Sequence, residues 1–215
     1  NPLTCHQDDF YRHPARDKTH GRIWRITPKK GALKVPDLVN LGDKDLVEML
    51  ASPERWTRLK AKQLLSSRDQ SKVVNILRNW VASREGLDLL EALSLLEFLS
   101  VPDSEILIKN INSDDPRIRA YAARVIGRWG TRLEGYHDLL LDLAQDKHPR
   151  VRMEVLLSCA QIPEPNSILV AAAVAEVSKD KWINYAFSQA VHHLKPRWIP
   201  AFREGNLDIA RYQSG

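Results

Sequence analysis

The chain reads Ile111-Asn112-Ser113-Asp114-Asp115-Pro116-Arg117-Ile118-Arg119 near its middle. Asp115 is of a residue type that caps helix N-termini, and Pro116 suits the first position of the helix that follows. The pattern returns at residues 50–58 and 144–152, each time between stretches whose apolar residues recur at three- and four-residue spacing. The sequence therefore predicts a repeated unit of helix, tight turn and helix.

Helical periodicity extends over residues 36–195 and predicts five helix pairs. One small position in each second helix defines the register, with separations of 31, 30, 33 and 31 residues. These positions are Ala61, Ala92, Ala122, Val155 and Ala186. A helix hairpin cannot bury its apolar stripe alone, so the pairs must stack on one another. We therefore expect an all-α fold, a right-handed α-α superhelix of about five helical pairs.

The breaks in periodicity set the expected helix limits. First helices are expected near 42–51, 70–82, 103–112, 136–145 and 167–178, and second helices near 54–67, 86–99, 115–129, 148–161 and 180–194. A short last helix is expected near 198–210. Most aromatic residues fall on apolar stripes and are expected in the core. They are Trp80, Phe98, Trp129, Trp182 and Phe187, whereas Trp56 lies beside a turn.

Composition limits the classes of protein that fit. The 215 residues are 43% hydrophobic and 27% charged, which is typical of an ordered globular chain. No apolar run approaches the roughly 20 residues of a membrane span. The net charge of +5 lies entirely in residues 1–35, where eight Lys or Arg face three Asp. Residues 36–215 are neutral, which argues against binding to duplex DNA. The start at Asn1 leads us to expect a fragment of a longer protein.

The repeats resemble the HEAT family of α-solenoids, in its short-repeat variety. The most recognisable mark is the turn Asp with the following Arg, here Asp115 and Arg119. The Asp position holds Glu54 in the first repeat and His148 in the fourth, and the Arg position holds Asn184 in the last. The resemblance implies a scaffold that binds proteins or spaces domains and carries no chemistry of its own.

The N-terminal segment has a different character. Residues 21–27, rich in β-branched and aromatic residues between Gly21 and Pro28, predict one β-strand, which needs a partner strand. The run from Cys5 to Ile26 resembles the closing strand region of a β-propeller in membrane-bound dehydrogenase-like proteins of planctomycetes and verrucomicrobia (PVC type). The resemblance rests on Arg16-Asp17 and His20-Gly21-Arg22-Ile23.

This second resemblance implies a place for the chain within a parent protein. Residues 1–35 would be the tail of an upstream propeller and a linker, and 36–215 a HEAT-like solenoid. The parent would be a sugar or alcohol dehydrogenase of the bacterial envelope, periplasmic or extracellular. The chain itself is not expected to bind haem, because a c-type site with Cys5-His6 would need a cysteine at position 2, which is Pro2. We expect no cofactor in this chain.

Two sets of side chains are candidates for binding. His6, His13 and His20 are spaced seven apart among aspartates, and imidazole and carboxylate suit Zn, Cu or Fe, but the spacing fits no closed metal site. Arg58, Arg119 and Arg152 recur on second helices. They would either grip phosphates or form a ladder that holds one repeat to the next through turn residues, and we favour the ladder.

The sequence thus predicts a non-catalytic protein-interaction or domain-spacing scaffold, whose partners are proteins, other domains of the parent chain among them. One alternative is a nucleic-acid-binding HEAT-like protein of the DNA-alkylation-repair type, and another is metal binding through the N-terminal histidines. No catalytic constellation stands out in the sequence. Cys159 lies on an apolar helix face, where a structural thiol is the usual case.

Overall fold

The computed structural model describes residues 36–177 and 180–210, together with the isolated positions 14, 17, 19, 21, 26, 29 and 31. The chain divides into two compact units, Asn1–Pro36 and Asp37–Gly215. In the first unit, Asp17 Oδ1 accepts hydrogen bonds of 3.0 Å from the backbone N–H and the hydroxyl of Thr19. The strand expected over 21–27 lies, apart from Gly21 and Ile26, outside the described residues.

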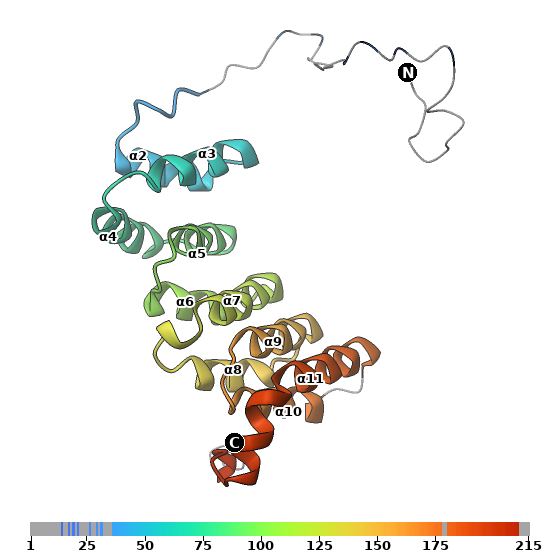
Figure 1. The fold of residues 1–215 in the computed structure, drawn as a ribbon. Coiled ribbons are helices and arrows are strands. Elements are labelled where there is room, and N and C mark those ends of the chain that lie inside the picture. Colours follow the sequence, from blue (N-terminus) through green and yellow to red (C-terminus); the bar gives the residue numbers. More distant parts are fainter. Residues whose placement is uncertain are drawn as a thin grey trace. The chain divides into compact units, whose positions relative to one another are not determined.

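The second unit consists of helices in its described residues, and the prediction of an all-α solenoid of helix pairs is confirmed. Figure 1 shows the pairs stacked in chain order, with first helices along one side and second helices along the other. The first helices are α2 (Asp43–Glu48), α4 (Gln70–Val81), α6 (Ser104–Ile111), α8 (Tyr136–Ala144) and α10 (Ser167–Val177). The second helices are α3 (Arg55–Leu65), α5 (Leu87–Leu99), α7 (Pro116–Trp129), α9 (Pro149–Gln161) and α11 (Lys181–Arg203). Short 3-10 segments, η1 (Met49–Ala51) and η2 (Gly130–Arg132), follow α2 and α7.

Local capping sets the start of the second helices. The carboxylate of Asp115 accepts a hydrogen bond of 2.8 Å from the backbone N–H of Arg117, and His148 Nδ1 accepts one of 3.2 Å from the N–H of Arg150. The carboxylate of Asp180 caps α11 in the same way. These side chains satisfy N–H groups that have no partner within the helix, so the turn sequence fixes where α7, α9 and α11 begin. The N-cap residues of α3 and α5, Glu54 and Gly86, make no such side-chain bond.

The predicted register positions are all buried. Ala61, Ala92, Ala122 and Val155 are fully enclosed, and Ala186 is 9% exposed, which confirms the predicted register. The described residues contain no helix with the length and apolarity needed to cross a lipid bilayer.

Two second helices approach each other closely at Gly127 of α7 and Ser158 of α9. A Cβ atom added to Gly127 would lie 2.7 Å from the Cβ of Ser158. The Ser158 hydroxyl donates a hydrogen bond of 2.8 Å to the carbonyl oxygen of Ala123. The absence of a side chain at residue 127 is therefore what lets α7 and α9 pack closely at this point.

The expected last helix near 198–210 is wrong. The helix α11 continues without a break from Lys181 to Arg203 and includes Pro196 and Pro200. A proline in a helix removes one backbone hydrogen bond, which makes a helix end the natural expectation. Here the buried stripe runs across both prolines, through Leu194 and Ala201, so packing against the stack maintains the helix.

The expectation for the aromatic residues is partly wrong. Trp80 and Trp129 are buried and Phe187 packs against the core, but Phe98 is 52% exposed and Trp182 is 62% exposed. The helix α5 is apolar almost all round, so its periodicity does not single out one buried face. Trp182 lies next to Ile183, which takes the core position, and neighbouring helix residues point about 100° apart.

Candidate functional site

Three equivalent arginines close the turn that precedes their helix. In each case Nη1 donates to the carbonyl oxygen six residues earlier. Arg58 bonds to Ser52 at 2.8 Å, Arg119 to Ser113 at 2.8 Å, and Arg152 to Asp146 at 2.5 Å. These turn carbonyls precede the start of the helix, and the charge-assisted bonds hold them in one geometry.

Two of the arginines also reach the next repeat. Arg119 makes a bidentate pair with Asp146, with Nε and Nη2 at 2.6 and 3.0 Å from the two carboxylate oxygens. Arg58 Nε lies 2.8 Å from Glu91 Oε1. The side chains of Arg119 and Asp146 are each 9% exposed, so this pair is shielded from solvent. Their geometry is that of a ladder between repeats.

The third arginine makes no such bridge among the described residues. Arg152 is 8% exposed, and its Nε is buried without a hydrogen-bond partner. The corresponding turn before α11 includes residues 178 and 179, which lie outside the described residues. Among the described residues, these arginines therefore link the first repeat to the second and the third to the fourth.

The turn aspartate Asp115 has a local role instead of a bridging one. Its carboxylate pairs with the Arg117 side chain at 2.6 Å in addition to capping α7. The side-chain and backbone hydrogen bonds from Arg117 lower the pKa of Asp115 to about 2. The acceptor for Arg119 is Asp146, two residues before the position where the repeat pattern places the turn Asp.

The surroundings of Asp146 keep its carboxyl group ionised. Burial by itself would raise the pKa of its carboxyl group, but the hydrogen bonds from Arg119 and from the His148 N–H outweigh burial and lower the pKa overall. The pKa of the Arg119 guanidinium is raised, mainly by its hydrogen bond to Asp146. Both groups therefore remain ionised at neutral pH, and their attraction is permanent under those conditions.

Sequence reasoning missed a second set of contacts between repeats. On the second helices, Arg124 pairs with Glu154 at 2.6 Å and Lys62 pairs with Glu91 at 2.5 Å. Glu97 contacts both Arg128 and the Tyr121 hydroxyl. The partners lie 24 to 31 residues apart, close to the repeat length, and that spacing is the signal that would have identified them. On the first helices, Arg78 bonds to Asp103 at 2.8 Å.

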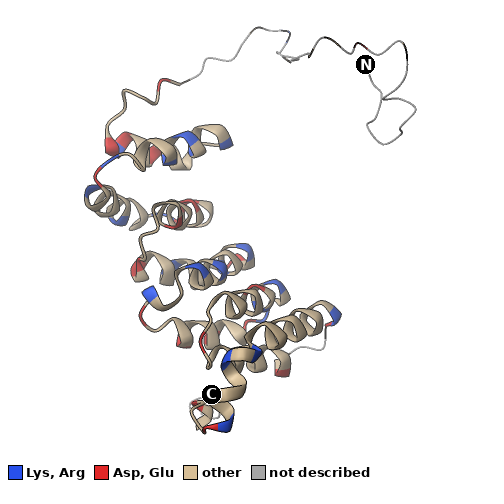
Figure 2. Ribbon diagram, in the orientation of Figure 1, with Lys and Arg blue, Asp and Glu red and all other residues tan. Residues whose placement is uncertain are grey.

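These pairs neutralise much of the charge on the second helices. Figure 2 shows that Lys and Arg (blue) and Asp and Glu (red) both occur along the helices of the second unit. The second helices also expose apolar side chains. Trp56 is 53% exposed and Leu59 50% on α3, Leu157 is 46% exposed on α9, and Trp182 and Tyr185 on α11 are 62% and 64% exposed.

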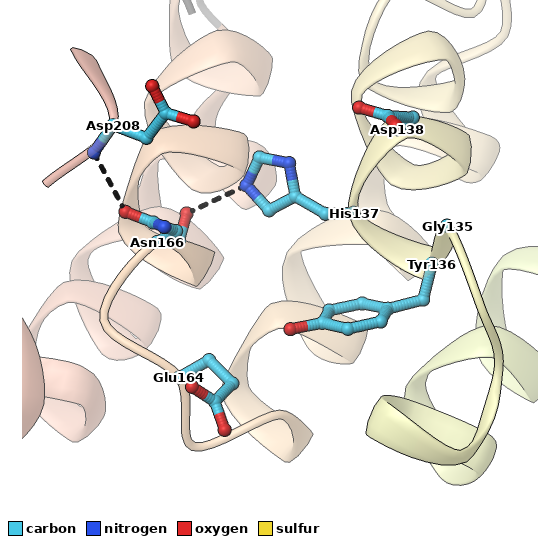
Figure 3. Close-up of a pocket in the computed structure, with 7 residues that line it drawn as sticks. All are labelled: Gly135, Tyr136, His137, Asp138, Glu164, Asn166 and Asp208. Carbon is cyan, nitrogen blue, oxygen red and sulfur yellow. Dashed lines mark hydrogen bonds between the residues drawn. The ribbon is translucent and has the colours of Figure 1, made fainter. Parts of the chain in front are cut away.

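Two of the pockets in the described part of the chain lie in the fourth and fifth repeats. One, of about 440 Å³, is lined by residues from the first turns of α9 and α11, Trp182 among them. The other, of about 310 Å³, lies beside α8. Figure 3 shows Asn166 between His137 and Asp208, bonded to His137 Nε2 through its backbone oxygen and to the Asp208 N–H through its side chain. This second pocket is crossed by contacts that tie the C-terminal segment to the stack.

The histidine candidates for a metal site are not tested. His6, His13 and His20 all lie outside the described residues. In the part of the chain that the structure describes, no three His, Cys, Asp or Glu side chains are arranged to hold a metal ion. Cys159 is fully buried, and burial raises the pKa of its thiol to about 12, so it is not an activated nucleophile.

Comparison with known proteins gives one family. Residues 104–191 match the family model of HEAT repeats. This range begins with α6 and ends within α11. A solved structure described as an engineered protein of the Northeast Structural Genomics Consortium is similar at 20% identity and a TM-score of 0.45, over 73% of this chain and 81% of that one. Among curated proteins, none matches the chain.

Proposed function

We propose that this HEAT-repeat region is a non-catalytic scaffold that binds other proteins through the face formed by its second helices. The observation that carries the proposal is the pair of exposed tryptophans, Trp56 on α3 and Trp182 on α11, on helices joined to their neighbours by buried contacts. Tryptophan is enriched among the residues that dominate the binding energy of protein interfaces. Removing such side chains from water on binding supplies free energy that folding has left unused.

The ladder supports this role by limiting how far repeats move relative to one another. The buried Arg119–Asp146 pair and the Arg58–Glu91 pair connect neighbouring second helices. A surface that is ordered before binding loses less conformational entropy when a partner docks. The same contacts disfavour the nucleic-acid alternative, because the guanidinium groups of Arg58 and Arg119 are engaged by carboxylates and carbonyls of the chain.

The scaffold proposal is tested by the position dependence of photo-crosslinking. The chain is expressed in its native cells with p-benzoylphenylalanine in place of Trp56, Trp182 or Tyr185, and adducts are identified by mass spectrometry. We expect protein adducts from these positions on α3 and α11, because they lie on the proposed binding face. Ile108 on α6, 44% exposed on a first helix, is the matched control and should give none.

Two outcomes would contradict the proposal. Equal adducts from Ile108 and from the second-helix positions would show that the contacts are nonspecific. Adducts confined to other parts of the same polypeptide would leave domain spacing as the function.

A finer proposal concerns the parent protein. We infer that the chain belongs to a dehydrogenase-like protein of the bacterial envelope, periplasmic or extracellular, and that it binds no cofactor itself. The resemblance of the Cys5 to Ile26 run to the end of a propeller supports this inference. We expect the gene to encode propeller blades before Asn1 and a Cys-x-x-Cys-His motif after Gly215. Flanking sequence without blades would remove the parent assignment and leave the scaffold proposal unaffected.

A further inference from the structure

The pocket beside Trp182 has walls of mixed chemistry. It measures about 440 Å³ and lies between the first turns of α9 and α11. The aliphatic part of its lining comes from Pro149, Met153 and Ile183, and the indole of Trp182 forms part of the same wall. Trp182 is 62% exposed, and so most of its ring has no contact within the described chain. A bulky apolar side chain would find contacts here that the fold itself does not supply.

The cations at and beside this pocket, Arg124, Arg150 and Lys181, outnumber its two carboxylates by one. Its two carboxylates are already engaged, because Glu154 pairs with Arg124 at 2.6 Å and Asp180 caps α11 through the N–H groups of Trp182 and Ile183. Arg150, by contrast, is exposed and makes no ion pair with any described residue. The ammonium of Lys181 lies 5.0 Å from the centre of the Trp182 ring. Arg150 and Lys181, which have no carboxylate partner among the described residues, therefore flank the apolar wall.

We infer that this pocket binds an acidic segment of a partner protein, with a bulky apolar side chain inserted against Trp182 and carboxylates placed at Arg150 and Lys181. The inference rests on the proposed scaffold function and names the partner chemistry of one part of that face. The N-terminal 35 residues of the chain itself are a poor occupant, since they carry a net charge of +5, the same sign as the pocket. Single-stranded nucleic acid is less well matched, because the aliphatic walls suit an apolar side chain better than the planar bases that stack on aromatic rings.

The experiment uses the full chain and a short fluorescein-labelled peptide in which two adjacent leucines are flanked by glutamates. Binding is followed by fluorescence anisotropy. We expect saturable binding that weakens about tenfold with Trp182→Ala, and about tenfold with Arg150→Glu, a loss equivalent to about 1.4 kcal/mol each. Both side chains are exposed, and a glutamate in the first turn of a helix is favourable, so both variants should fold.

Matched controls come from the first helices, outside the proposed binding face. Ile108→Ala on α6 removes an exposed apolar side chain, and Lys72→Glu in the first turn of α4 reverses an exposed positive charge. They should leave the affinity unchanged. Peptides with alanines in place of the leucines, or lysines in place of the glutamates, should bind at least about tenfold more weakly.

The remaining possible results of these experiments would contradict the inference in different ways. Absence of saturable binding, or equal loss with Ile108→Ala and Trp182→Ala, would overturn the inference. Tighter binding of a fluorescein-labelled oligothymidylate than of the peptide, lost with Trp182→Ala, would assign the pocket to nucleic acid instead. Photo-crosslinks from Trp56 without peptide binding at the pocket would leave the scaffold function standing while this inference fails.

Discussion

Replacing Gly127 with valine is expected to lower the free energy of unfolding by about 3 kcal/mol. The new Cβ would lie 2.7 Å from both the Cβ and Oγ of Ser158 and 2.8 Å from its Cα. Because one of these atoms belongs to the backbone of α9, rotation of a side chain cannot relieve the overlap. The helices α7 and α9 must move apart, with loss of the buried contacts between them. Chemical denaturation followed by circular dichroism measures the change.

The sign of the effect of Gly127→Ala gives a sharper test. In the interior of an ordinary helix, alanine is more stable than glycine by roughly 0.5–1 kcal/mol. At this crossing the alanine methyl would be the atom that overlaps Ser158, so the substitution should destabilise the protein. Gln189→Val, at an exposed position of α11, is the control for introducing valine into a helix and should change stability by about 0.5 kcal/mol or less. A stabilising Gly127→Ala would show that the two helices separate easily.

Arg119→Met is expected to cost about 3 kcal/mol, the lower end of the range for breaking a buried ion pair. The substitution leaves the Asp146 carboxylate enclosed with two N–H donors fewer, and it removes bonds to the carbonyl oxygens of Ser113 and Asp114. Arg117→Met is the matched control. It breaks an ion pair of the same length, 2.6 Å, but the Arg117 side chain is 75% exposed, so solvent replaces the lost contact and little stability should be lost. Equal losses in the two variants would contradict a bridging role for Arg119.

The Arg119 variant should also change how stability depends on pH. Asp146 has a lowered pKa in the folded protein, so its contribution is fully present above the pKa of an unfolded aspartate, about 3.9. That contribution is lost as the pH falls through the lower folded pKa. The wild-type protein should therefore lose stability below about pH 4, and Arg119→Met should lose less over the same range. Identical acid profiles would show that Asp146 is not held by this arginine.

Part of the arginine ladder could be predicted from the sequence. The recurrence of Arg58, Arg119 and Arg152 follows from the aligned turns, and the contact six residues back repeats in all three. Asp146 occupies the same aligned place as Ser113, so it too was visible as a turn residue near the next helix. What the alignment did not provide was the choice of acceptor, because Arg119 reaches Asp146 while Asp115 turns back to Arg117. That choice depends on how far one helix is displaced along its neighbour.

On the candidate binding face, the exposure of Trp182 could likewise not be predicted from the sequence alone. Periodicity placed Trp182 in the core, but its neighbour Ile183 competes for that place, because two successive helix residues cannot both point inward. The structure resolves this by burying Ile183 and leaving most of the indole in solvent. The pocket beside it forms only where the first turn of α9 meets that of α11, across residues about 30 positions apart in the chain.

The sequence by itself determined the helix pairs, their order and their small buried positions, because caps, turns and apolar spacing act within a few residues. Tertiary structure decided the rest. It kept α11 helical through Pro196 and Pro200, left Phe98 exposed, and brought α9 so close to Gly127 that no side chain fits there. The physical reason is that local patterns fix which residues lie on which side of a helix, whereas burial and pairing depend on how neighbouring helices cross, and crossing is a property of two surfaces distant in the chain.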